Sequence, residues 1–237
     1  GFFFTATSDY PRYDRLMRKK DGQLKSAVWN YTPQEWINGN LRITHKGSSL
    51  YDKSIFTLSY QNFKEGRRDR DFGDTILYET KEKVNAYTSA LDFIKKFGKS
   101  KLFYGLEYVY NKVNSLGKQT NLLNGATSET SPRYPDDSNW QSMAAYVSLQ
   151  SKLAANLSLQ LGLRYNHILL YANYDNPFYD FPFIESDINT GALTGSVGFN
   201  WQASEILGWR FNLSTAFRAP NIDDVGKIFD SEPGSVV

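Results

Sequence analysis

The amino-acid sequence predicts an all-β fold of antiparallel, up-and-down transmembrane β-barrel strands joined by long extracellular loops. Three observations support this prediction. Several segments alternate apolar and polar residues, the connections between them alternate between short and long, and aromatic residues make up 16% of the chain. A period of two is the repeat of a β-strand. Aromatic side chains are enriched where a membrane protein meets both lipid and water.

The clearest strand is expected over residues 157–166, where every second side chain is apolar. One face carries Leu157, Leu159, Leu161, Leu163 and Tyr165. The same pattern, with no charged residue on the apolar face, is found at residues 101–111, 193–202 and 209–218. Weaker strands are expected at residues 41–45, 54–62, 84–95 and 141–151. The chain should therefore contribute about eight strands, each with a face that lipid can contact.

The connections between these segments alternate in length along the chain. The short ones are 46–51, 97–100, 152–156 and 203–208, and the long ones are 63–75, 113–138 and 167–191. Outer-membrane barrels have short periplasmic turns and longer extracellular loops. A soluble β-sandwich, whose strands alternate equally well, remains an alternative. Trp201 and Trp209 flank one short connection, where they would either form part of an interfacial belt or cap an ordinary core.

Two parts of the chain are distinguished by composition. Residues 1–38 are expected to form an extracellular loop segment, and residues 39–237 a partial β-barrel. The sequence contains no run of the roughly 20 apolar residues that a transmembrane helix needs. Alternating strands keep the mean hydropathy low, so this absence does not argue against a barrel.

Composition and motifs exclude several classes of function. The formal net charge of +2 leaves no excess of cations for a nucleic-acid partner, and the absence of cysteine excludes thiolate sites. No catalytic motif is present, and a hydrolase would need a Ser/His/Asp set converging on one rim, so no enzyme is expected. His45 and His167 lack metal-type spacing. Asp69, Asp71 and Asp74 alternate with arginines, which favours a solvated hairpin tip over a calcium site.

The segment 169–184 is the main candidate for ligand binding, because it crowds aromatic rings into an expected extracellular loop. The candidate ligand-binding residues there are Tyr171, Tyr174, Phe178, Tyr179 and Phe181. Exposed rings are costly unless they pack or bind, so they either capture a ligand or form the loop's own core. Stacking surfaces would suit a porphyrin, an aromatic siderophore or a sugar. His167, at the entry to this loop, is either a haem ligand or an ordinary rim residue.

Four stretches of the chain resemble TonB-dependent receptors. Phe217-Arg218-Ala219-Pro220 and the residues that follow it to Lys227 resemble the strand-exit motif of this family. The resemblance is nearest to the haem and haemoglobin receptor branch and its relatives in the Bacteroidetes. The other three stretches are Pro11–Leu16, Trp29–Gln34 and Phe63–Gly73.

The resemblance implies a protein of the cell outer membrane, with a barrel of about 22 strands that surrounds an N-terminal plug. Roughly eight strands cannot close such a barrel, so the chain is expected to be a portion of a longer receptor. Receptors of this kind import a scarce nutrient through TonB-linked energy coupling, here haem or an iron chelate, and their barrels contact outer-membrane lipid. Receptors for cobalamin, a glycan or a peptide are the alternative within the family. The resemblance implies no resident cofactor.

The family pattern also suggests roles for single polar residues. The residues expected to face the barrel lumen are Glu107, Arg164, Arg210 and Asn212. They would contact the plug or the passing ligand, or simply solvate the barrel interior. Arg218, in the Phe-Arg-Ala-Pro motif, is expected to be a hydrogen-bonding anchor at the outer rim, with either a structural or a ligand-contacting role.

Overall fold

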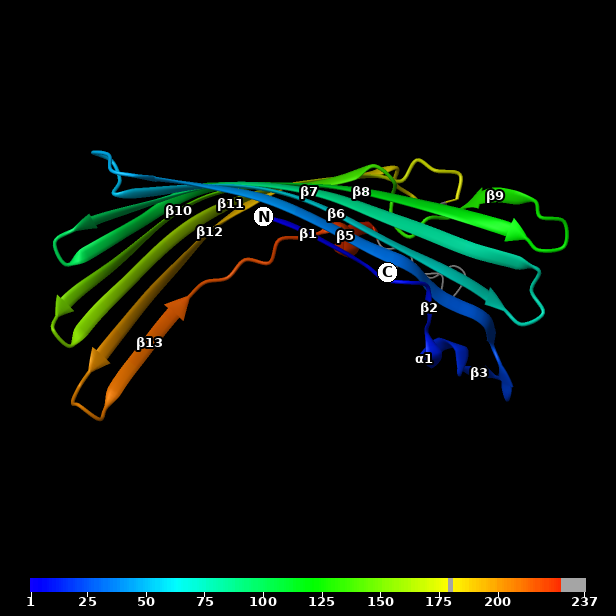
Figure 1. Cartoon of the computed structure of the whole chain (residues 1–237), viewed down its shortest axis with the longest axis horizontal. Coiled ribbons are helices and arrows are strands. Elements are labelled where there is room, and N and C mark those ends of the chain that lie inside the picture. The colour runs from blue at the N-terminus through cyan, green and yellow to red at the C-terminus, as the bar shows by residue number, and fades with distance from the viewer. Residues whose placement is uncertain (179–180, 227–237) are drawn as a thin grey trace.

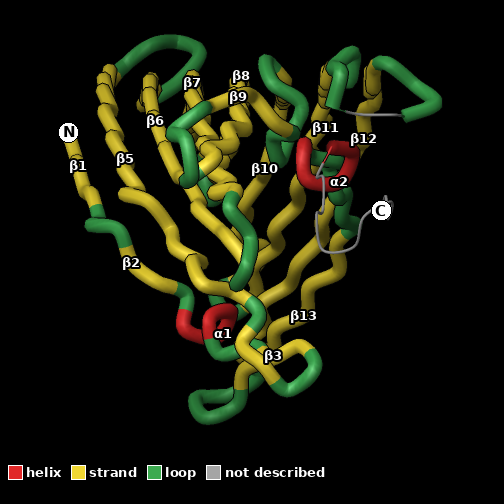
Figure 2. The backbone as a smooth tube through the Cα atoms, turned by 90° about the vertical axis from the view of Figure 1, so that its right-hand side faces the viewer, coloured by secondary structure: helices red, strands yellow, loops and turns green. Residues whose placement is uncertain are grey.

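The computed structural model of the chain describes residues 1–178 and 181–226, and most of this part is β-strand. Figure 1 and Figure 2 show that the strands form one sheet that curves into a trough. Two short helices, α1 (Tyr13–Leu16) and α2 (Ile222–Gly226), lie outside the sheet. Among the described residues, no helix is long and apolar enough to cross a membrane.

Eight strands follow one another across the sheet, and each pairs antiparallel with the next. They are β5 (Ser26–Lys46), β6 (Lys53–Asp71), β7 (Ile76–Phe97), β8 (Ser100–Asn121), β10 (Ser138–Ala154), β11 (Leu157–Asn173), β12 (Glu185–Gln202) and β13 (Gly208–Ser214). This single up-and-down sheet confirms the predicted fold class. It is not the pair of packed sheets that a β-sandwich would require.

Five shorter strands complete the described secondary structure. β1 (Phe2–Ala6) and β2 (Tyr10–Pro11) pair with β5, and β9 (Thr127–Thr130) pairs with β8. β3 (Lys19–Lys20) and β4 (Gln23–Leu24) form a separate two-stranded sheet. The N-terminal segment therefore lies along the β5 edge of the trough and does not cross its face.

Several strands begin or end at residues other than those that the sequence predicted. β6 and β7 continue to a connection of four residues, 72–75, so the prediction of a long loop at 63–75 was wrong. β5 begins at Ser26, within the segment that was expected to be a loop. β13 ends at Ser214, before Arg218 is reached. Hydrophobic alternation marks only the part of a strand that has one apolar face, so it misses the polar ends of long strands.

The connections differ between the two ends of the trough. One end, here called the short-turn end, carries the connections 47–52, 98–99, 155–156 and 203–207. The other, the long-loop end, carries 72–75, 122–137 and 174–184. The two longest connections therefore lie at the same end, as in up-and-down outer-membrane barrels.

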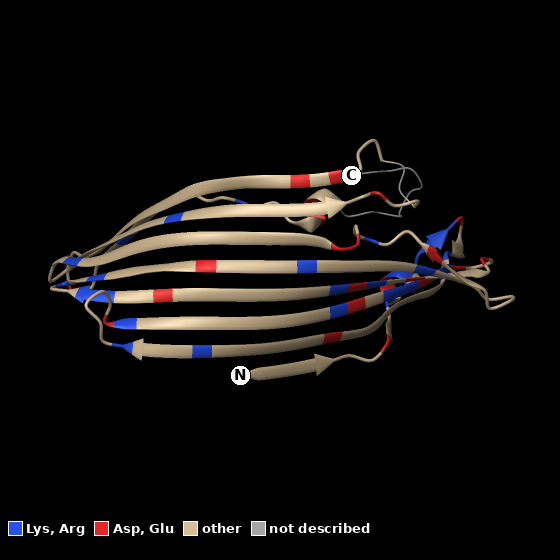
Figure 3. Ribbon diagram, turned by 90° about the horizontal axis from the view of Figure 1, so that it is seen from above, with Lys and Arg blue, Asp and Glu red and all other residues tan. Residues whose placement is uncertain are grey.

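The outer, convex face of the sheet carries a broad apolar band. Leu106, Leu163 and Leu193 are exposed on it. The pairing register places no Lys, Arg, Asp or Glu on this face within residues 37–43, 56–60, 87–93, 102–110, 143–149, 157–171, 191–201 and 209–213. Figure 3 shows that charged residues gather mainly towards the strand ends. A sheet that faces lipid needs such a band.

Trp201 and Trp209 lie on the same outer face at the short-turn end. They are direct cross-strand partners in β12 and β13, and both side chains are about half exposed. Neither ring caps a core in the described part of the chain. Their position at the margin of the apolar band is the one that an interfacial belt occupies.

The inner, concave face is mostly polar, with a small apolar group near the short-turn end that includes the buried Ile55, and a larger one near the long-loop end. There Val113, Leu170, Ala172 and Tyr174 are buried together with Ile222 of α2. The indole of Trp140, on the same face, packs against this cluster. This small core fixes residues 215–226 against the inside of the trough.

Candidate functional site

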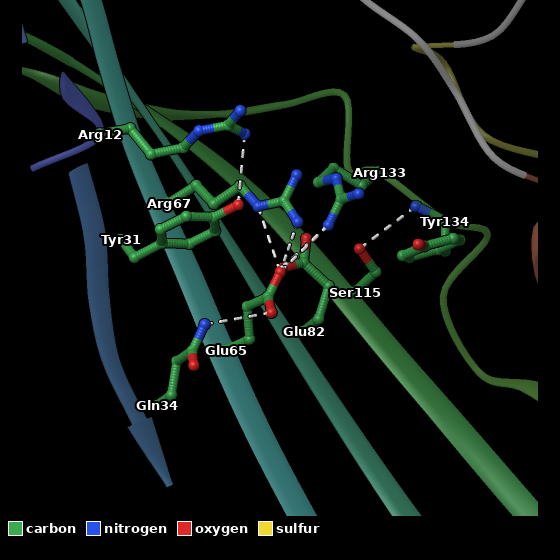
Figure 4. Close-up of polar contacts among 9 residues, drawn as sticks. All are labelled: Arg12, Tyr31, Gln34, Glu65, Arg67, Glu82, Ser115, Arg133 and Tyr134. Carbon is green, nitrogen blue, oxygen red and sulfur yellow. Dashed lines mark hydrogen bonds and ion pairs between the residues drawn. The ribbon is translucent and has the colours of Figure 1, made fainter. Parts of the chain in front are cut away.

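A cluster of four charged side chains lies on the inner face near the long-loop end, and Figure 4 shows it. Glu65 of β6 accepts hydrogen bonds from Arg67 Nε at 3.1 Å and Nη2 at 2.5 Å. Arg133, from the connection after β9, donates to the same Oε1 atom of Glu65 at 3.4 Å. Its Nη1 also lies 3.8 Å from Glu82 Oε2. Arg133 therefore lies between two carboxylates on neighbouring strands, and Arg67 pairs with one of them, that of Glu65.

Aromatic and amide groups from β5 border this charged cluster. The guanidinium of Arg67 lies over the ring of Tyr31, 5.1 Å from its centroid. Arg12 donates to the Tyr31 hydroxyl at 3.4 Å, and Gln34 Nε2 donates to Glu65 Oε2 at 3.4 Å. A β-bulge between Thr32 and Glu35 shifts the register of β5. The shift brings both Tyr31 and Gln34 to the same side as the charged cluster.

A cavity of about 620 Å³ opens beside the cluster. It is lined by residues from β6, β7, β8 and β10, from the connection before β10, and from α2 and the residue before it. Its lining consists of Phe63, Glu65, Arg67, Glu82, Val84, Asn111, Val113, Arg133, Tyr134, Trp140, Asn221, Ile222 and Asp223. The volume falls in the range of small-molecule sites, and apolar walls with a few converging polar groups are typical of them.

Tyr134 forms one wall of this cavity, outside the strands. Its backbone N–H donates to Ser115 Oγ at 3.3 Å, and the Arg133 guanidinium lies 5.1 Å from the centroid of its ring. Burial, and then a hydrogen bond with Asp223, raises the pKa of Tyr134 to about 12. The phenol is therefore neutral at physiological pH and can donate its proton within the cavity.

Glu82 is the least satisfied polar group at this site. Its residue is only 6% exposed, and neither carboxylate oxygen has a hydrogen-bond partner within the described residues. The Oδ1 atom of Asn111, which also lines the cavity, is unpartnered in the same way. Buried acceptors without donors are costly. These three oxygen atoms could accept hydrogen bonds from a group that enters the cavity.

The described residues offer this cavity no metal centre. No group of three or more His, Asp or Glu side chains that could hold a metal ion occurs among them. Two guanidinium groups can pair with carboxylates, and aromatic rings can stack on a flat ligand.

The four residues expected to face the lumen all lie on the concave face. Arg164 and Glu107 form an ion pair of 2.7 Å across β11 and β8. Arg164 also donates from Nε to Asn166. Arg210 and Asn212 lie on the same face of β13, nearer the short-turn end. None of the four lines the 620 Å³ cavity.

The aromatic residues expected to bind a ligand do not converge on one ligand site. Tyr174, Phe181 and Phe183 pack on one another with ring centroids 5.2–5.6 Å apart, so these three form the loop's own core. The hydroxyl of Tyr174 donates to the carbonyl oxygen of Val225. Phe178 lies apart from them, beside β8 and β9. Tyr179 lies outside the described residues.

Tyr171 and His167 lie on the other side of the sheet. Both occupy outer-face positions of β11, in line with Leu163 and Tyr165. His167 Nδ1 lies 3.3 Å from the Tyr165 hydroxyl, and the two rings are stacked. The sheet therefore separates both residues from the inner cavity.

Arg218 lies in the segment between β13 and α2. Its guanidinium donates to the carboxylate of Asp224, and its side chain remains 80% exposed. Asp224 accepts a hydrogen bond from the backbone N–H of Asn221, and this bond, together with Arg218, lowers the pKa of its carboxyl group. Arg218 thus holds the start of α2 and does not line the cavity.

Sequence reasoning missed Glu65, Glu82, Arg133 and Tyr134 as site residues. One signal pointed to this place in the fold, although it includes only Glu65 of the four residues, because the four stretches that resemble TonB-dependent receptors meet here. Pro11–Leu16 supplies Arg12, Trp29–Gln34 supplies Tyr31 and Gln34, and Phe63–Gly73 supplies Glu65 and Arg67. The fourth stretch supplies Asn221, Ile222 and Asp223 to the cavity wall.

Comparison with known proteins assigns the family. Residues 2–235 match the family described as TonB dependent receptor-like, beta-barrel. The chain belongs to this family. Members of the family are outer-membrane proteins and transporters, which places this chain in the outer membrane. No curated protein matches the chain.

Two solved structures show the same fold at low sequence identity. The copper transporter OprC superposes with a TM-score of 0.72 at 13% identity, over 81% of this chain and 32% of that chain. The siderophore receptor PiuA from Acinetobacter baumannii gives a TM-score of 0.59 at 15% identity, over 86% of this chain and 37% of that chain. The chain therefore spans about a third of the length of these TonB-dependent receptor structures.

Proposed function

We propose that this chain is the part of a TonB-dependent receptor that forms one wall of the ligand-binding mouth, and that the receptor imports haem or an iron chelate. The observation that carries the proposal is the inner-face cavity of about 620 Å³ beside Glu65, Arg67, Glu82 and Arg133. It lies at the long-loop end of the trough, which is the extracellular end in barrels of this kind. Energy for import would come from TonB through the plug.

The apolar band on the outer face would contact outer-membrane lipid. Trp201 and Trp209 would then sit at the periplasmic interface, where the polar edge of an indole reaches headgroups and water. The concave face would enclose the plug and the passing ligand. Its charged groups, such as the Glu107–Arg164 pair, are stable there because the interior of the barrel is polar.

The proposed ligand is anionic with a flat or aromatic part, and it would compete with Glu65 for the two guanidinium groups. The guanidinium groups of Arg67 and Arg133 would pair with propionate or chelate carboxylates, and the rings of Tyr134 and Trp140 would pack on the ligand. Glu82 and Asn111 would accept hydrogen bonds from it or from the plug. The two structural neighbours, a copper transporter and a siderophore receptor, support a metal-related cargo.

Within the same family, cobalamin, a glycan or a peptide is the alternative cargo. His167 has no part in the proposed site, because it lies on the outer face. An axial haem ligand would have to come from elsewhere in the receptor. Porphyrin binding through carboxylates and stacking does not depend on His167.

Ligand titrations with the intact receptor test the proposal. Haemin and a ferric siderophore are titrated against the wild type, Arg67→Gln and Arg133→Gln. A charged hydrogen bond is worth about 1.5–3 kcal/mol, so each variant should bind the cargo at least tenfold more weakly. Arg42→Gln, an exposed inner-face arginine outside the cavity, is the matched control. Unchanged affinity in both cavity variants, with the receptor folded, would overturn the proposal.

A further inference from the structure

The outer face carries three ordered rows of side chains across β6, β7 and β8, which begin at the middle of these strands and continue towards the long-loop end. The first is a row of tyrosines in direct cross-strand register, Tyr60, Tyr87 and Tyr110. Their ring centroids are 5.0 Å apart for the first pair and 6.2 Å apart for the second. This row ends the apolar band on these strands, because the next outer-face positions are polar.

Two residues further along each strand, the second row consists of Asn62, Asn85 and Lys112. The Oδ1 atom of Asn85 accepts hydrogen bonds from Tyr60 OH at 3.0 Å and from Asn62 Nδ2 at 2.9 Å. These bonds tie the asparagines to the tyrosine row. The second row therefore forms a fixed polar step directly beyond the apolar band.

The third row places two like charges directly opposite each other. Lys64 of β6 is the cross-strand partner of Lys83 of β7. The direct partner of Lys83 on β8 is Asn114. Lys112 lies two residues before Asn114, in the second row, and is therefore a diagonal neighbour of Lys83. Like charges in direct register destabilise a sheet unless an anion lies between them. The three lysines thus form a compact cationic group on three neighbouring strands.

The counterions of this group are few and exposed. Lys64 pairs with Glu35 at 2.8 Å, and Lys112 pairs with Asp137 at 2.6 Å, but Lys83 makes no ion pair within residues 1–178 and 181–226. The Asp137 side chain is 70% exposed. Exposed ion pairs of this kind contribute little, so an external anion can replace either carboxylate at small cost.

We propose that Lys64, Lys83 and Lys112 bind the phosphate groups of the outer-leaflet glycolipid. The proposal rests on the membrane orientation given under the proposed function. If the tyrosine row marks the boundary of the hydrocarbon region, a lysine two to four residues beyond it stands about 7–14 Å further out, since a strand rises about 3.4 Å per residue. That is the level of lipid headgroups, and lysine carries a compact charge that binds phosphate.

Lipid retention by the intact receptor tests this site. The receptor is purified in detergent, incubated with bisphosphorylated lipid A, and analysed by native mass spectrometry. Each lysine near a headgroup should strengthen lipid binding about fivefold. Lys64→Gln/Lys83→Gln should therefore retain about 25-fold less lipid than the wild type. The wild type and Lys64→Gln/Lys83→Gln should bind dephosphorylated lipid A equally weakly. Raising the salt concentration should weaken binding of the phosphorylated lipid.

The matched control removes two exposed lysines at the short-turn end, in Lys101→Gln/Lys152→Gln. It should retain lipid A as the wild type does. Lys64→Arg/Lys83→Arg keeps both charges and should also retain it. Equal retention by Lys64→Gln/Lys83→Gln and the wild type, or equal retention of phosphorylated and dephosphorylated lipid, would overturn the proposal. Cargo affinity should not change in these variants, so a failure here is distinct from a failure of the proposed function.

Discussion

The indole Nε1 of Trp140 in β10 donates a hydrogen bond of 2.8 Å to the carbonyl oxygen of Pro220. This bond fixes the segment that follows β13 to the inside of the trough, next to the candidate cavity. The same segment is held at its other end by Tyr174, whose hydroxyl donates to Val225. The cavity wall formed by Asn221, Ile222 and Asp223 therefore depends on contacts with strands that are distant in sequence.

Trp140→Phe should loosen this segment, because it removes the donor and keeps an aromatic ring. A net hydrogen bond is worth about 1 kcal/mol, so protease cleavage between residues 215 and 221 should be about fivefold faster in the variant. Trp209→Phe, an indole on the outer face, is the control and should leave the cleavage rate unchanged. Equal cleavage rates for the wild type and Trp140→Phe would show that the bond does not hold the segment.

Arg133→Gln should lower the free energy of unfolding strongly. Arg133 is the nearest cation to the buried Glu82, and both side chains are largely shielded from water. Removing one partner of a buried ion pair costs about 3–5 kcal/mol, because the other charge is left without compensation. In Glu82→Gln/Arg133→Gln the loss should be smaller than in Arg133→Gln alone. Urea unfolding of the refolded receptor measures both, and a larger loss in the double variant would contradict this account.

Glu107→Gln should have a much smaller effect, although its ion pair with Arg164 is shorter. Both side chains of this pair are 36% exposed. Ion pairs with this exposure contribute about 0–1 kcal/mol, because water screens them. The same urea titration should therefore show a loss below about 1 kcal/mol. A loss as large as that of Arg133→Gln would mean that the pair is shielded in the intact barrel.

The free energy of unfolding, measured at alkaline pH, should show the contribution of Tyr134 to stability. Its pKa is raised from the ordinary value of 10.0 to about 12 by burial and by Asp223. A raised pKa in the folded state contributes stability that is complete below pH 10 and is lost as the pH rises towards 12. The stability difference between the wild type and Tyr134→Phe should therefore shrink across this interval. Tyr13→Phe, at an exposed ring, serves as the control, and a difference that stays constant would refute the assignment.

Arg218→Ala in the intact receptor should leave the melting temperature nearly unchanged, because the ion pair with Asp224 is exposed. It should reduce cargo uptake, since Arg218 holds the start of α2, and Asn221 and Ile222 line the cavity wall there. Uptake is measured at equal surface abundance. Normal uptake at normal abundance would remove any important role for this residue.

The strands were predictable where one face is apolar and the other polar. Leu157 to Tyr165 alternate without interruption, and β11 begins at Leu157 as expected. The sequence predicts a loop from residue 63 because both faces of β6 are mostly polar over residues 64–71. Glu65 and Arg67 lie on the inner face and Lys64 on the outer face. A strand end of this composition has no hydrophobic period to detect.

The candidate site was less predictable, because it is built from long-range contacts. Arg133 reaches Glu65 across 68 residues of sequence, and no local pattern encodes such a pair. The aromatic loop was conspicuous in the sequence, yet Tyr174 and Phe181 pack on each other. His167 falls on the outer face because the register of β11 alternates without a bulge up to that residue. Period-two reasoning could have placed it there.

Cargo-dependent growth shows directly whether the receptor imports haem or an iron chelate through this cavity. A strain that lacks the receptor is complemented with the wild type or with Arg67→Gln/Arg133→Gln, at matched surface abundance, and grown under iron starvation with haem or a ferric siderophore as the sole iron source. We expect growth with the wild type on at least one source, loss of that growth without TonB, and poor growth with the variant. Equal growth of all strains on every iron source, with or without TonB, would contradict it.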